Sequence, residues 1–252
     1  MTSYPCALAA AMRQEAESRP DEAVSCAVAG KLLVAVGAAN MGLCTNVAGE
    51  AFAPASGKTL HELLPGLALT GLDGRAASLA VAAAGALLPP PGVPVRKAQD
   101  LIMAHGEGRR VAVVGHFPFV EKMGPAFAAF SVLERVPRPG DLPAGQADRV
   151  LPEADVVAIT ASALANGSLG GLLDLCAPGA FVLLVGPSTP FAVCLFDFGI
   201  DVLCGNLVTD APAVLDGVSR GLPYRALQGL SAVCAVREDF MKKSVDGKND
   251  SR

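Results

Sequence analysis

The sequence has no tryptophan, two tyrosines and three histidines among 252 residues, and only 17% of its residues are charged. It also has no dense run of lysine and arginine, and its formal net charge is -4. Nucleic-acid binding depends on basic patches and on aromatic side chains that stack on bases. We therefore expect no nucleic-acid partner.

The seven cysteines are scattered along the chain, and none belongs to a C-x-x-C pair. This pattern fits free thiols in a reducing compartment better than a disulfide framework. The N-terminal segment lacks the basic start and apolar core of a signal peptide, and the best apolar run, residues 76–88, is shorter than the roughly 20 residues that span a bilayer. We expect a cytoplasmic protein with no membrane partner.

The hydrophobic content of 52% is enough to bury a sizeable core. Residues 6–18 predict a short amphipathic helix, and the β-type runs of residues 23–49 predict a small antiparallel meander. The alanine-rich residues 74–89, which three prolines end, predict a helix packed on that meander. Residues 1–92 should therefore form a small α+β module.

The proline-rich stretch PPPGVPV at residues 89–95 predicts a linker, because prolines cannot continue a helix. Beyond it, helical and strand patterns alternate, which indicates a parallel sheet with helices on both faces. Strands are expected at residues 111–115, 131–135, 155–160, 180–185 and 201–204, and helices at 96–104, 118–130, 168–176, 190–197 and 210–219. We expect an α/β, Rossmann-like domain over residues 93–235, and a polar tail over residues 236–252.

Ligands of open parallel sheets bind beyond the carboxyl ends of the strands. The segments there are GHFPF (115–119), ERVPRPGD (134–141), TASALANGS (160–168) and GPSTP (186–190). Pro118 suits a first helical position, and Ser168 and either Ser188 or Thr189 suit helix N-caps. Helix starts expose unpaired N–H groups, so three of them at one edge would attract a phosphate or carboxylate. The alternative is three ordinary loops with ordinary caps.

Two residues at these strand ends have titratable side chains that could meet a ligand. His116 can act as an acid, a base or a metal ligand, or it can be a hydrogen-bonded structural residue. Glu134 follows Gly115 at about the spacing at which an acidic residue binds a ribose, or it pairs with Arg135 or Arg138. A dinucleotide is not expected, because Phe117 stands where a glycine must let the backbone approach a pyrophosphate.

Four segments together resemble the putative heavy-metal chelation family: VAVVGHFPFVEKM, VLERVPRPGDLPA, LPEADVVAITASALANGSLGGLLDL and VLLVGPSTPFAVCLFDFGIDVLCG. The resemblance covers about residues 97–221. It implies a Rossmann-like domain preceded by a module similar to the N-terminal domain of enolases, with a ligand cleft between them. The site residues that it implies are His116, Phe117, Pro118, Arg138, Asp141, Thr160, Asn166, Gly167, Pro187, Ser188 and Thr189, faced by Cys44 and Thr45 from the smaller module; Glu134 joins them from its spacing.

Three hypotheses about function follow. The first is a protein that binds or processes a small anionic, metal-chelating ligand in the cleft between the domains, either alone or as a chelate of a divalent transition metal. The second is an enzyme that uses a nucleoside cofactor such as S-adenosylmethionine, and the third is an assembly subunit whose cleft has lost its ligand. The apolar composition and glycine-rich surfaces also suggest a homodimer. The residues do not define a reaction or a catalytic group.

Overall fold

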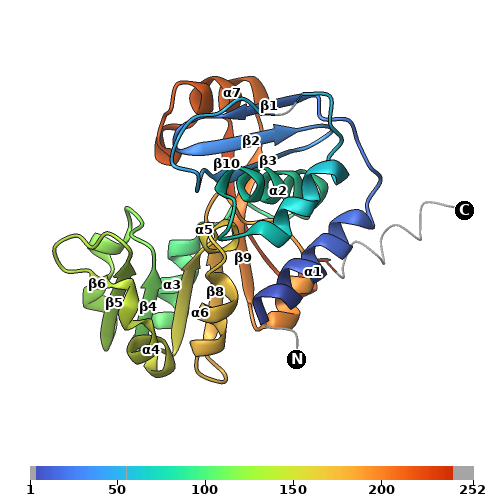
Figure 1. Ribbon diagram of the computed structural model, residues 1–252. Coiled ribbons are helices and arrows are strands. Elements are labelled where there is room, and N and C mark those ends of the chain that lie inside the picture. The colour runs from blue at the N-terminus through green and yellow to red at the C-terminus, as the bar shows by residue number, and fades with distance from the viewer. Residues whose placement is uncertain (1–3, 55, 241–252) are drawn as a thin grey trace, which may run out of the picture.

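A computed structural model describes residues 4–54 and 56–240 of the chain. It contains a three-stranded sheet and a seven-stranded sheet, with helices packed on both (Figure 1). No helix in these residues is both long and apolar enough to pass through a lipid bilayer. The predicted fold class, a mostly parallel sheet flanked by helices and preceded by a small α+β part, is confirmed.

The small sheet is the predicted antiparallel meander. Its strands are β1 (Cys26–Ala29), β2 (Leu33–Gly37) and β3 (Met41–Thr45), in that order. The alanine-rich helix α2 (Gly74–Leu87) packs against β3 so closely that a side chain at Gly42 would collide with the carbonyl oxygen of Ala82. Small residues on both elements permit this approach, so the predicted helix-on-sheet packing is confirmed.

Two more helical segments lie beside this unit. The helix α1 (Tyr4–Glu17) contacts the 3-10 helix η1 (His61–Leu69), which in turn packs along α2. The other face of the small sheet is covered by α7 (Ala211–Ser219), a helix from the far end of the chain, as Figure 1 shows. Residues beyond the proline-rich linker therefore help to bury the small sheet, whereas the boundary at residue 92 stays a prediction.

The large sheet has the strand order β10-β9-β8-β7-β4-β5-β6, and all neighbours are parallel except β9 and β10. The strands are β4 (Arg110–Val114), β5 (Ala129–Glu134), β6 (Leu142–Pro143), β7 (Val156–Thr160), β8 (Phe181–Val185), β9 (Val202–Val208) and β10 (Leu230–Val236). The chain proceeds from β4 in one direction through β5 and β6, and then in the other through β7, β8 and β9. The order reverses between β4 and β7, which is where doubly wound sheets bind their ligands.

Both faces of this sheet are buried, as the near-continuous apolar strands predict. Along β4, Val111 and Val113 join a core under α3 (Ala98–Gly106), while Ala112 and Val114 join the core on the opposite face. That opposite core includes α5 (Ser162–Ala165) and α6 (Leu169–Leu175). The short helix α4 (Ala147–Val150) lies near the end of the sheet at β6.

Two predicted helices are wrong. Residues 118–130 form two 3-10 turns, η2 (Val120–Lys122) and η3 (Gly124–Ala126), before β5 begins at Ala129. Pro125 has no N–H to donate and disfavours a helical residue before it, so the pair Gly124-Pro125 interrupts a continuous helix. Residues 190–197 also lack an α-helix, because Pro190 is followed by the 3-10 helix η6 (Val193–Phe198).

The C-terminal part of the large sheet was only partly predicted. Strand β9 runs beyond residue 204 to Val208, and β10 pairs with it as an antiparallel edge strand. Within the predicted polar tail, Arg237 pairs with Asp197 at 2.7 Å, and the ring of Phe240 contacts that of Phe196. Residues 241–252 lie outside the described part of the chain.

Candidate functional site

A cavity of about 640 Å³ lies at the carboxyl ends of β4, β5 and β7, on the edge where the strand order reverses. Thr45, the last residue of β3, lines it from the small sheet. Six of the predicted site residues line this cavity: Thr45, His116, Phe117, Glu134, Thr160 and Asn166. The cavity therefore brings together side chains that are far apart in the sequence.

Gly115 directly follows β4 and has a positive φ of 102°, which lets the chain turn over the sheet edge. The next residue, His116, donates its backbone N–H to Oε2 of Glu134 at 2.8 Å. The other carboxylate oxygen of Glu134, Oε1, accepts the N–H of Arg135 at 2.6 Å. Glu134 thus connects the ends of β4 and β5, while each of its oxygens retains a lone pair for a further hydrogen bond.

The imidazole of His116 is held by a buried carboxylate. Its Nδ1 lies 3.0 and 2.9 Å from the two oxygens of Asp141, and the side chains are only 7% and 4% exposed. Because the carboxylate accepts, Nδ1 carries the proton, and neutral His116 has its lone pair on Nε2. That Nε2 is buried and has no hydrogen-bond partner in residues 4–54 and 56–240; the Glu121 carboxylate oxygen Oε1 lies 3.7 Å from it.

The surroundings of Asp141 favour its ionised form. Burial by itself raises the pKa of its carboxyl, but the N–H of Arg138 at 3.0 Å and the ring of His116 outweigh that effect. The pKa of Asp141 therefore lies below its usual value. An ionised Asp141 orients His116 in the way that a carboxylate orients a metal-binding or catalytic histidine.

The β7 side of the cavity is lined by small polar side chains. The hydroxyls of Thr160 and Ser162 lie 3.1 Å apart, so one of them donates a hydrogen bond to the other. Directly after the end of α5, Oδ1 of Asn166 accepts both the N–H of Ser168 at 3.0 Å and its hydroxyl at 2.6 Å.

Thr45 is positioned by a residue from the large sheet. Its N–H donates to Oγ of Ser188 at 2.8 Å, and the hydroxyl of Ser188 donates to Oγ1 of Thr45 at 3.3 Å. Ser188 is 1% exposed and lies in the loop after β8. The neighbouring Cys44 is fully buried, and burial raises the pKa of its thiol to about 12, so it stays protonated.

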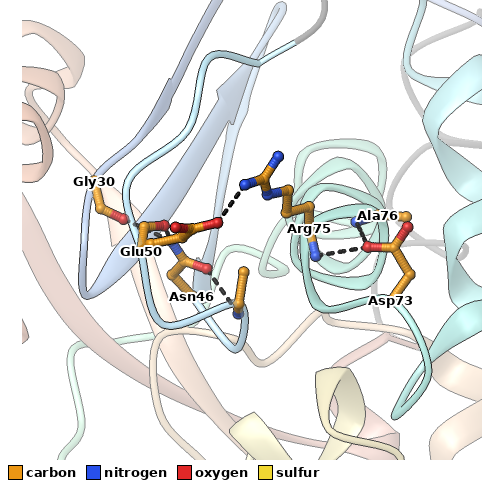
Figure 2. Close-up of polar contacts among 7 residues, drawn as sticks. Gly30, Asn46, Glu50, Asp73, Arg75 and Ala76 are labelled. Atoms are coloured by element: carbon orange, nitrogen blue, oxygen red, sulfur yellow. Dashed lines mark hydrogen bonds and ion pairs between the residues drawn. The ribbon is translucent and has the colours of Figure 1, made fainter.

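The loop after Thr45 is held in place by a second polar cluster, which Figure 2 shows. Asn46, 6% exposed, donates to the carbonyl oxygens of Gly30 and Glu50, both at 2.7 Å. Glu50 forms an ion pair with Arg75, and Asp73 caps the same helix start by accepting the N–H groups of residues 75 and 76. This cluster connects the end of β3 to α2, which keeps Thr45 at the rim of the cavity.

The remaining predicted site residues do not line the cavity. Asp141 and Ser188 lie directly behind it, bonded to His116 and Thr45, and Arg138 contributes its backbone N–H to Asp141. Cys44 is buried in the core, and Pro118 lies in the turn after His116. Gly167 lines a separate small cavity together with Thr70, and a further small cavity is lined by Pro187 and Thr189.

The expected convergence of three helix N-termini is wrong. Pro118 precedes only a three-residue 3-10 turn, and Ser168 makes no capping hydrogen bond with its side chain. At the third expected helix start, after Pro190, the first N–H groups of η6 are those of Val193 and Cys194, and both donate to the carboxylate of Glu15 at 2.8 Å. Only the start of α6, whose N-cap residue Ser168 lines the cavity, lies at this edge, so the polar side chains and not three converging helix N-termini define what the cavity can bind.

Sequence reasoning missed several residues of the cavity wall, among them Ser162, Gly145, Ala147 and Leu172. Ser162 lies in the segment 160–168 that the strand-end rule had singled out, but it was not among the residues that the family resemblance implied. Gly145, Ala147 and Leu172 come from helical segments with no chemical signal in the sequence.

Metal-ligating side chains are dispersed over this part of the chain. Within residues 4–54 and 56–240, no three His, Cys, Asp or Glu residues lie close enough together to hold a metal ion. The polar groups that line the cavity are instead hydroxyls, one amide, the imidazole of His116, the guanidinium of Arg135 and the carboxylate of Glu134.

Comparison with known proteins agrees with this architecture. A family model described as putative heavy-metal chelation (DUF364) matches residues 97–237. The crystal structure of a DUF364-family protein of unknown function from Desulfitobacterium hafniense is similar with a TM-score of 0.81 and 26% identity, covering 91% of this chain and 98% of that one. A structure of a family protein of unknown function from Pyrococcus horikoshii, at a TM-score of 0.74 and 17% identity, covers 91% of this chain and 99% of that one and shows the same fold. No curated protein matches the chain.

Proposed function

The chain belongs to the putative heavy-metal chelation family, and from that membership we propose that it binds a small anionic, metal-chelating ligand in the cavity between its two sheets. The observation that carries the proposal is the cavity itself. It is large enough for a small organic molecule, it lies where the strand order reverses, and it is lined by both sheets.

We propose that the metal is cargo that enters together with its chelator. The described residues offer no cluster of three metal-ligating side chains for a bare ion, so the chelator would supply most of the donor atoms. His116 supports a contact to such a ligand, because it lines the cavity and, when neutral, has a lone pair on Nε2, an atom that has no hydrogen-bond partner among the described residues. The exposed Glu121 side chain would move aside to open the path to that nitrogen.

Calorimetric titration tests the proposal with three probes: the nickel–nitrilotriacetate complex, nickel alone and nitrilotriacetate alone. Gly145→Phe is the blocking variant, because Gly145 lines the cavity and a Cβ there meets no atom within 4 Å. Gly171→Phe, on the exposed surface of α6 with equally open space, is the control. We expect the complex to bind more tightly than the metal alone, and Gly145→Phe to abolish that binding. Equal affinity for the bare metal, or full binding by Gly145→Phe, would refute the proposal.

A nucleoside cofactor is the second candidate, and one observation favours it. Glu134 ends the second strand of the sheet and lines the cavity, which is where an acidic residue contacts a ribose in doubly wound sheets. Thermal-shift measurements with S-adenosylmethionine and adenosine test it, with Glu134→Gln as the variant. A shift with either nucleoside that Glu134→Gln removes would favour this candidate over a chelate.

A cytoplasmic location and a homodimer stay predictions from the sequence. Analytical ultracentrifugation at several protein concentrations measures the second, and a single species of monomer mass would contradict it.

A further inference from the structure

Hydrogen bonds inside the protein determine which polar atoms of the cavity can still donate a proton. Asn166 shows this most clearly. Its Oδ1 is identified by chemistry, since it accepts the backbone N–H of Ser168 at 3.0 Å, and it accepts the Ser168 hydroxyl as well. Within the described part of the chain the side-chain NH₂ of Asn166 makes no hydrogen bond, so it remains a donor at the cavity.

Two further positions keep a proton to donate. The Thr45 hydroxyl oxygen accepts from Ser188, so the hydrogen of the Thr45 hydroxyl is available to a ligand. Thr160 and Ser162 have two hydroxyl protons and use one between themselves, which leaves the second free. Thr45, Asn166 and the Thr160–Ser162 pair therefore form a donor wall, which suits the oxygen atoms of a carboxylate.

The opposite side of the cavity has the reverse polarity. Glu134 can only accept, and both its oxygens keep a lone pair after binding the N–H groups of His116 and Arg135. Glu134 ends β5 and Thr160 ends β7, with β4 between them. Two strand spacings separate their backbones, which amounts to about 10 Å. A small molecule can therefore contact both sides at once.

We propose that the ligand is an aminocarboxylate, whose carboxylate binds the donor wall and whose protonated amine or N–H binds Glu134. This inference rests on the proposed function and names the chemical class of the chelator. Arg135, exposed beside Glu134 at the cavity, provides a cation for a second carboxylate of the same molecule. An aminocarboxylate fits this cavity better than a simple anion does. An anion without a donor group would place its own negative charge against the carboxylate of Glu134.

Three probes of equal length separate these possibilities. Iminodiacetate has two carboxylates around a protonated amine, glutarate replaces that amine by a methylene group, and glutaramide has neutral amides in place of the carboxylates. We expect affinity to fall in the order iminodiacetate, glutarate, glutaramide, measured by amide NMR titration without metal. Glutarate carries the larger net negative charge, so attraction for anions alone predicts the opposite order for the first two. Glutarate binding as tightly as iminodiacetate, or glutaramide binding as tightly as glutarate, would overturn the inference.

Asn166→Asp tests the donor wall. The aspartate keeps the oxygen that binds Ser168 and replaces only the NH₂ group by a charged acceptor, so the fold should be preserved. Asn40→Asp adds the same charge on an exposed turn of the small sheet and serves as the control. We expect Asn166→Asp to weaken iminodiacetate binding about tenfold or more and Asn40→Asp to leave it unchanged. Equal affinities of the two variants would overturn the inference.

The nickel–nitrilotriacetate titration separates this inference from the proposed function. If the chelate binds but glutarate equals iminodiacetate, the inference fails and the function stands. If iminodiacetate binds in the expected order but no chelate binds, the function fails and the polarity of the cavity stands.

Discussion

Ser188→Ala should weaken the connection between the two sheets at the cavity. The substitution removes the acceptor of the Thr45 N–H at 2.8 Å and the donor to the Thr45 hydroxyl at 3.3 Å. A buried N–H left without an acceptor costs about 1–3 kcal/mol. Because Thr45 lines a large cavity that water can enter, water can replace part of the lost bond. We therefore expect the free energy of unfolding to fall by about 1–2 kcal/mol, in the lower half of that range.

Thermal unfolding measures this loss directly. For a chain of 252 residues, a change of about 1–2 kcal/mol corresponds to a decrease in Tm of about 2–8 °C. Ser131→Ala is the control, because Ser131 lies partly buried on β5 and its side chain makes no hydrogen bond in the described structure. Ser188→Ala should also weaken iminodiacetate binding, since the Thr45 hydroxyl loses its orientation. A Tm equal to that of Ser131→Ala would show that Ser188 does not hold Thr45 in place.

Three further substitutions test the polar contacts around the site. Asp141→Asn should lower the free energy of unfolding by about 2–3 kcal/mol at pH 7. Because the pKa of Asp141 is lowered in the fold, this difference from wild type should be complete above about pH 4 and should disappear as the pH falls through the folded-state pKa. Urea unfolding at several pH values measures it. Glu15→Ala removes the acceptor of two backbone N–H groups and should cost about 2 kcal/mol or more, whereas Glu17→Ala, which breaks an exposed ion pair, should cost less than about 0.5 kcal/mol in the same assay. Asn46→Ala should lower the Tm clearly and Arg75→Ala only slightly, because the first loses buried hydrogen bonds and the second a solvent-exposed pair; equal shifts would contradict this reasoning.

The parts of the fold that sequence predicted are those set by local apolar pattern. The apolar run VAVV forms most of β4, and the glycine after it adopts the positive φ of a turn. The alanine-rich run before three prolines forms α2. The predicted helix over residues 118–130 failed because apolar content alone cannot distinguish a helix from turns that a Gly-Pro pair interrupts. Strand β10 was missed because a short apolar run such as LSAVCAV has no periodicity that identifies its partner.

The candidate site divides in the same way. His116 and Glu134 were found because parallel strands end at one edge of a sheet, so a residue at the end of a strand has a predictable place. Thr160 lies in a segment found in the same way, but only the family resemblance named it as a site residue. Thr45 came only from the family resemblance, since its place at the cavity depends on how the small sheet packs against the loop that holds Ser188. The roles of Asp141 and Glu15 needed coordinates, because each binds groups far away in the sequence.

The amino-acid sequence by itself therefore determined most of the segments that are strands, where most of these end and which of their residues have reactive side chains, because those properties depend on neighbours along the chain. Only the tertiary structure decided which polar groups are already paired with each other and which still face the cavity. That distinction depends on hydrogen bonds between segments that are distant in the sequence, and it sets the donor at Thr45, held by Ser188, against the acceptor at Glu134, held by His116.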